Sequence, residues 1–171
     1  MGPLPLWIPR RCTLRRRIGQ FRLGGPPVRL ESSILTPVTL DQTWSFLASP
    51  VQTSPLWDRS VAEVIPDSDG PVGVGWTATT VAPSGNRQRF EVTRFDPGRE
   101  LAFNLLESSM FRSAELTFVV AAAPDGTWIH HVIDLRLRNF ILWPILRLIQ
   151  RRALARDLRD LRSALARTYL G

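Results

Sequence analysis

Apolar and polar residues alternate along the stretch from Trp128 to Leu137. On an extended chain, alternate residues point to opposite faces of a sheet. Every second residue of this stretch, namely Ile129, His131, Ile133, Leu135 and Leu137, lies on one face, which is apolar except for His131. The pattern therefore predicts a strand with one buried face, and it places His131 on that face and His130 on the opposite one.

The same alternation recurs in several other stretches, which are separated by short segments rich in Gly, Pro, Asp and Asn. We expect strands at 30–35, 61–66, 74–81, 88–96, 100–106, 112–122 and 128–137. The connections after residue 60 are too short for the crossovers that parallel strands need. These six strands are therefore predicted to form an antiparallel meander, in which Val74, Trp76 and Ala78 share the inner face of one strand.

Helical spacing dominates the end of the chain. Leu154, Leu158, Leu161 and Leu165 follow one another at steps of four, three and four, which keeps them on one face of a helix predicted over 142–169. Such a helix is roughly 40 Å long at 1.5 Å per residue, so its apolar stripe needs a broad surface such as a sheet. Shorter helical segments are expected at 40–48 and near 54–58. The predicted fold is α+β, an antiparallel six- to seven-stranded sheet curved around the long C-terminal helix.

The net charge of +7 is unevenly distributed along the 171 residues. Residues 1–30 and 142–171 are strongly basic, whereas residues 31–141 carry thirteen acidic and eight basic side chains. Nucleic-acid binding is not expected, because the body is acidic and its arginines are not interleaved with aromatic residues. The basic face of the C-terminal helix leaves open a peripheral contact with an anionic membrane surface.

Residues 1–27 are rich in Pro and Arg, contain no acidic residue and show no sustained period. We expect this arm to be disordered, or to result from a start codon assigned too early, and a single domain to occupy residues 28–171. No uninterrupted apolar run follows the arm's charges, as a secretory signal would require. Because Cys12 is the only cysteine, no disulfide framework is possible, and we expect a cytoplasmic location.

Several short motifs of the chain together resemble a known family. They are Thr36-Pro37, Trp44-Ser45-Phe46-Leu47, Pro55-Leu56-Trp57-Asp58, residues 91–99 (EVTRFDPGR), Asp125-Gly126-Thr127 and residues 157–162 (DLRDLR). In order and spacing, they resemble the START-like (SRPBCC) superfamily, in its polyketide cyclase/dehydrase and lipid transport branch. The resemblance covers the chain from about residue 30 to its end. It implies a helix-grip fold with an apolar cavity between the sheet and the C-terminal helix.

The candidate ligand-binding residues are mostly aromatic or aliphatic side chains that the alternation or the helical period turns inward. They are Trp57, Trp76, Phe90, Phe103, Phe118, His131, Ile133, Trp143 and Ile149. Apolar pockets that carry a few polar groups are the usual form of small-molecule sites. Each of these side chains could equally serve only as packing in the core.

Catalytic and metal motifs are largely missing from the sequence. With two histidines and one cysteine, no zinc cluster is expected, and no cofactor is predicted. The function we expect is non-catalytic binding or carriage of a hydrophobic small molecule or lipid. The alternative is an enzyme of the polyketide cyclase or dehydratase type, in which His131 acts as the acid or base.

Overall fold

The computed structural model describes residues 28–108, 111–137 and 143–171, and for residues 137 and 143–152 it describes the backbone alone. The N-terminal arm predicted at residues 1–27 lies outside these ranges. The side chains of two candidate site residues, Trp143 and Ile149, also lie outside the described part.

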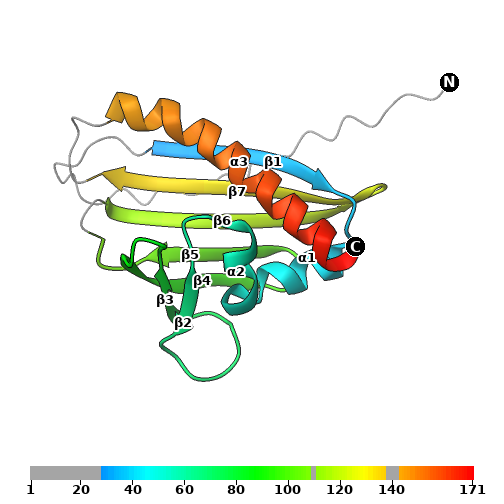
Figure 1. The fold of residues 1–171 in the computed structure, drawn as a ribbon, viewed down its shortest axis with the longest axis horizontal. Coiled ribbons are helices and arrows are strands. Elements are labelled where there is room, and N and C mark those ends of the chain that lie inside the picture. Colours follow the sequence, from blue (N-terminus) through cyan, green and yellow to red (C-terminus); the bar gives the residue numbers. More distant parts are fainter. Residues whose placement is uncertain (1–27, 109–110, 138–142) are drawn as a thin grey trace, which may run out of the picture.

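A seven-stranded antiparallel sheet forms the body of the protein, with strand order β1-β7-β6-β5-β4-β3-β2 (Figure 1). The strands are β1 (Val28–Thr36), β2 (Glu63–Pro66), β3 (Thr77–Val81), β4 (Arg87–Asp96), β5 (Glu100–Leu105), β6 (Phe111–Ala123) and β7 (Gly126–Leu137). The helices are α1 (Leu40–Leu47), α2 (Pro50–Trp57) and α3 (Trp143–Tyr169). The predicted α+β helix-grip fold is confirmed.

Strands β2 to β7 form the meander that the short turns predict, since each pairs with the next along the chain. Strand β1 completes the sheet by pairing with β7, so that Ser32 lies opposite His131. Short turns could not predict this pairing, because it joins segments about a hundred residues apart.

Helix α3 crosses in front of the sheet and packs along β1 (Figure 1). Leu154, Leu158, Leu161 and Leu165 are each at most 2 % exposed. The last three belong to one buried cluster with residues of α1, β4, β5, β6 and β7. The stripe predicted from the helical period is therefore the surface by which α3 packs on the sheet.

Helix α1 begins at a capping box, in which the Thr39 side chain accepts from the backbone N–H of Gln42 and the Gln42 side chain accepts from that of Thr39. Helix α2 starts at Pro50, which is tolerated there because a first helical turn does not need the missing N–H. Helix α1 contacts β6, β7 and α3, and α2 contacts β2 and α3 (Figure 1).

The prediction of a strand from Val74 to Val81 is wrong at its start. Strand β3 begins at Thr77, and Val74 is 70 % exposed in the loop that precedes it. Gly75 has a φ of +86°, which takes the backbone out of the extended conformation. The glycines around Val74 thus keep it off the inner face, whereas Trp76 and Ala78 are buried as expected.

Candidate ligand-binding site

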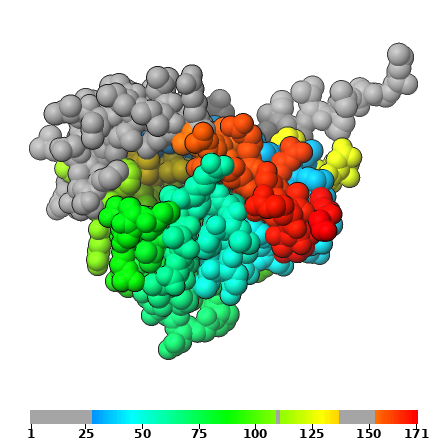
Figure 2. Space-filling model, in the orientation of Figure 1, coloured from blue at the N-terminus to red at the C-terminus, as the bar shows by residue number. Residues whose placement is uncertain are grey.

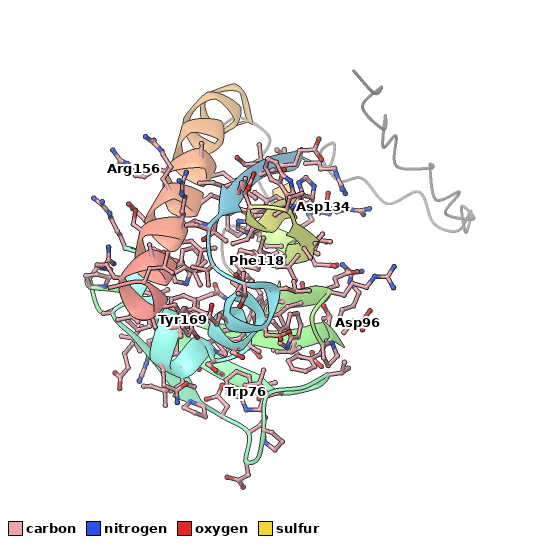
Figure 3. All side chains as sticks on the ribbon, turned by 90° about the vertical axis from the view of Figure 1, so that its right-hand side faces the viewer. Trp76, Asp96, Phe118, Asp134, Arg156 and Tyr169 are labelled. Carbon is pink, nitrogen blue, oxygen red and sulfur yellow. The ribbon has the colours of Figure 1, made fainter. Side chains whose placement is uncertain are left out.

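The inner face of the sheet, toward α3, is almost wholly apolar. Strand pairing arranges its side chains in rows that run across β1, β7, β6 and β5. One row is Ser32, His131, Phe118 and Leu101, and the next is Leu30, Ile133, Leu116 and Phe103. Figure 3 places Phe118 between the sheet and α3, whereas Asp96 and Asp134 point to the other side of the sheet.

Six ring side chains form two groups on this face, which we call the aromatic wall. In the first group, the His131 ring stacks on Phe118 at 4.0 Å between centroids, and Trp57 from α2 meets Phe118 edge-on at 6.0 Å. In the second, Phe90 contacts Phe103 at 5.3 Å and Trp76 at 5.9 Å. The edge-to-face contacts of Trp57 with Phe118 and of Phe90 with Phe103 are a favoured arrangement of aromatic pairs.

The inner face is not packed evenly. Phe118, Val92 and Leu101 are buried, but the side chains of Phe103, Leu105, Leu116 and Ile133 are only half-buried although they face α3. In the space-filling view of Figure 2, atoms of the central strands are set back in a hollow between α3 and the β3–β4 hairpin. The half-buried residues therefore offer apolar surface on which another molecule can pack.

His131 is the exceptional polar residue of the inner face. Its side chain is 3 % exposed, and neither ring nitrogen has a hydrogen-bond partner. Burial, with a smaller contribution from the neighbouring His130, lowers the pKa of His131 to about 3. The ring is therefore neutral at physiological pH, with one nitrogen as a donor and the other as an acceptor.

The neighbouring His130, in contrast to His131, has a hydrogen-bond partner. His130 lies on the outer face, where its Nδ1 is 2.7 Å from the Ser33 hydroxyl. Polar groups at one end of the inner face are also paired: the Thr127 hydroxyl donates to the carbonyl of Val38 at 2.8 Å, and Thr36 Oγ1 accepts from the N–H of Val38. Among the buried side chains that the structure describes, only Thr43 shares the unpaired state of His131.

The outer face is polar and carries several ion pairs. Arg94 pairs with Glu100 and Glu115, and Arg29 pairs with Asp134 at 3.0 Å. A groove of about 340 Å³ on this face is lined by Asn104, Ser113, Glu115, Asp134, Leu135 and Arg136. Because all of these residues except Leu135 are polar or charged, this groove offers little to a hydrophobic ligand.

No cluster of three or more His, Cys, Asp or Glu side chains suited to a metal ion occurs within the described ranges. In the same ranges, no helix is both long enough and apolar enough to cross a membrane. The cytoplasmic location expected from the sequence stays a prediction.

One further titratable group is perturbed where α3 meets the α2–β2 connection. Burial, together with the nearby Asp58 and Asp160 carboxylates, raises the pKa of Asp157 to about 6, against the opposing effect of Arg156 and Arg59. Arg59 pairs with Asp160 at 2.9 Å, which leaves Asp157 without a comparable partner among the described ion pairs. The ionised form of Asp157 is therefore less favourable in the folded protein than in the unfolded chain.

This environment predicts that stability depends on pH. The folded-state pKa of Asp157 is above its unfolded value of 3.8, so the native state loses stability as pH rises between about 4 and 6 and carries the full penalty above pH 6. We expect Asp157→Asn to raise the free energy of unfolding at pH 7.5 by about 1 kcal/mol, a value reduced because the side chain is half-exposed. Urea unfolding at pH 7.5 and 4 measures the effect.

The exposed loop residue Asp69 supplies the matched control, since Asp69→Asn removes a charge with no such surroundings. An equal gain from both substitutions would assign the effect to net charge instead of to the α2–α3 contact.

The structure brings seven of the nine candidate site residues to the inner side of the sheet. They are Trp57, Trp76, Phe90, Phe103, Phe118, His131 and Ile133. Their role in ligand binding stays a prediction. Leu105 and Leu116 were not among the candidates, although the alternation along their strands turns both inward.

A model of the family described as polyketide cyclase / dehydrase and lipid transport matches residues 27–166. The search of curated proteins gave no match.

Solved structures with the same fold come from several sources. A START superfamily protein from Mycobacterium smegmatis has a TM-score of 0.67 at 12 % identity, over 82 % of this chain and 98 % of the other. Major latex-like protein 151 from Panax ginseng has a TM-score of 0.67 at 14 % identity, over 81 % and 97 %. The di-domain ARO/CYC protein StfQ of the steffimycin biosynthetic pathway has a TM-score of 0.62 at 17 % identity, over 82 % and 50 %. At these identities the likeness shows the helix-grip fold.

Proposed function

Because the chain belongs to the polyketide cyclase/dehydrase and lipid transport family, we propose that it binds a hydrophobic small molecule or lipid between the inner face of the sheet and α3, as a carrier. The observation that carries this proposal is the half-buried apolar surface of Phe103, Leu105, Leu116 and Ile133. Each square ångström of such surface removed from water contributes about 25 cal/mol to the free energy of binding, so a ligand can be held without a covalent or catalytic step.

Two features favour a carrier over an enzyme. The pKa of His131 is too low for the ring to hold a proton at neutral pH, and a base this weak gains little from proton abstraction. No carboxylate or hydroxyl within the described ranges is hydrogen-bonded to the ring, so nothing orients it as the partner in a catalytic pair does.

A polyketide cyclase is the second candidate, since one structure of the same fold is an ARO/CYC protein. In that role His131 would be the inner-face group able to move a proton. A peripheral membrane protein is the third, with the exposed Arg156, Arg159 and Arg162 of α3 facing anionic headgroups. Asp157 and Asp160 on the same helix offset part of that charge, which weakens this third proposal.

Native mass spectrometry of the purified full-length protein, followed by solvent extraction of what stays bound, tests the carrier proposal. We expect an apolar molecule to co-purify with the wild type. Leu116→Trp should remove it, because the added ring fills the half-buried inner surface of β6.

Val119→Trp is the matched control, since Val119 is also a half-buried residue of β6 but lies on the outer face, opposite His130. Retention of the ligand by Leu116→Trp, or an equal loss in both variants, would contradict the proposed position. Bare protein mass in the wild type would instead favour the enzyme, whose substrate the expression host lacks.

A further inference from the structure

Among the side chains that the structure describes, His131 is the one buried polar group of the inner face without a hydrogen-bond partner. A buried polar group without a partner costs free energy, and native proteins keep few of them. His131 has two such atoms, both ring nitrogens, in a side chain that is 3 % exposed. Repacking with leucine at this position would avoid the cost, so the imidazole calls for a functional explanation.

His131 is a polar side chain surrounded mostly by apolar ones. The rows on either side of it are aliphatic in β7 and β6: Ile129 and Val120 on one side, Ile133 and Leu116 on the other. Within its own row, Phe118 covers one face of the ring, with an interplanar angle of 14°. The neighbour on β1 is Ser32, a half-buried hydroxyl residue in direct register with His131.

The half-buried surface lies directly beside this polar side chain. Ile133 is two residues from His131 on β7, and Leu116 is opposite Ile133 on β6. A molecule that packs on these two side chains therefore reaches the row of His131 and Ser32 without crossing any other polar side chain that the structure describes on the inner face of the sheet.

The same surroundings determine whether a ligand group next to His131 can be charged. On the outer face, Arg94 of β4 pairs with Glu115 of β6, and Asp134 of β7 pairs with Arg29 of β1, so these charges do not face His131. A charged ligand group beside His131 would thus be buried in apolar surroundings without a counter-charge, which is costly. A neutral imidazole instead suits a hydroxyl, which can donate or accept, or a carbonyl, which accepts.

We infer that His131 determines ligand specificity, and that the hydrophobic ligand carries an uncharged hydroxyl or carbonyl group that hydrogen-bonds to this ring. The inference rests on the proposed function, because it requires a ligand on the inner face. It makes His131 a recognition residue instead of an acid or base, and it gives the protein a preference for alcohols, phenols or ketones over carboxylic acids of the same size.

Three probes with one ring system test the inference: naphthalene, 2-naphthol and 2-naphthoate. Their dissociation constants are measured on the full-length protein by tryptophan fluorescence, since Trp57 and Trp76 belong to the aromatic wall. For the wild type we expect saturable binding of naphthalene and 2-naphthol and the weakest binding for 2-naphthoate. In His131→Leu, the affinity for 2-naphthol should fall about five- to tenfold, the range for loss of one neutral hydrogen bond, while that for naphthalene stays unchanged.

His131→Gln controls for the shape of the site, because it keeps a donor and an acceptor and should recover much of the preference for 2-naphthol. A thermal melt of each variant confirms that it folds. Equal losses for naphthalene and 2-naphthol in His131→Leu, or tightest binding of 2-naphthoate by the wild type, would overturn the inference and leave the carrier proposal standing. No saturable binding of any probe by the wild type would count against both.

Discussion

Gly126→Ala is expected to destabilise the protein by about 3 kcal/mol or more. Gly126 opens β7 with a φ of +132°, a conformation that residues with a side chain rarely adopt. A Cβ at this position would lie 2.0 Å from the carbonyl oxygen of Thr36 and 2.8 Å from the Cα of Pro37. Both obstacles are backbone atoms, so no side chain can move aside, and the end of β1 would have to separate from β7.

Urea unfolding of the variant measures this cost, and Gly85→Ala serves as its control. Gly85 has a φ of +83°, but a Cβ there meets nothing within 4 Å. We expect only the conformational strain at Gly85, about 1 kcal/mol. Similar losses at the two positions would show that the approach of Thr36 to Gly126 is not tight.

The position of Gly126 also links stability to the site. The pairing of β1 with β7 that starts at Thr36 and Thr127 continues to Ser32 and His131. A displacement of β1 would therefore move the polar row of the inner face. We expect Gly126→Ala to weaken 2-naphthol binding as well, even though Gly126 is five residues from His131 along β7.

Strand alternation predicted the inner face from sequence because it depends on local geometry alone. The inward position of His131 follows from its place between Ile129 and Ile133, and the structure confirms it. The stripe of Leu154 to Leu165 is predictable for the same reason, since a helix repeats every 3.6 residues whatever surrounds it. The alternation gave a wrong result at Val74. The apolar pattern already begins there, but Gly75 takes the backbone out of the extended conformation, and the strand starts only at Thr77.

What makes the site distinctive could not be predicted, because it depends on residues distant in sequence. The sequence does not indicate that His130 is hydrogen-bonded to Ser33 whereas His131 has no partner. Which residue of β1 lies opposite each histidine depends on the register of β1 against β7. The low pKa of His131 follows from burial, which requires the whole sheet and α3. The contact of Trp57 with Phe118 likewise depends on where α2 packs.

Leu161→Ala is expected to lower the free energy of unfolding by about 3 kcal/mol, within the usual range for truncating a buried leucine. Leu161 is 0 % exposed and belongs to the same buried cluster as Phe46 of α1 and Ile129 of β7. The substitution removes apolar contact and leaves a cavity at the point where α3, α1 and the sheet meet. Chemical denaturation of the variant measures the loss.

The adjacent Arg162→Ala is the control, because Arg162 is exposed on the same helix and its removal should change stability by no more than about 0.5 kcal/mol. An equally small effect of Leu161→Ala would mean that α3 is not held to the sheet by its leucine stripe. Since the proposed ligand lies between α3 and the sheet, a loosened helix should also release it faster. A variant that lost stability but kept the ligand as long as the wild type would place the ligand away from α3.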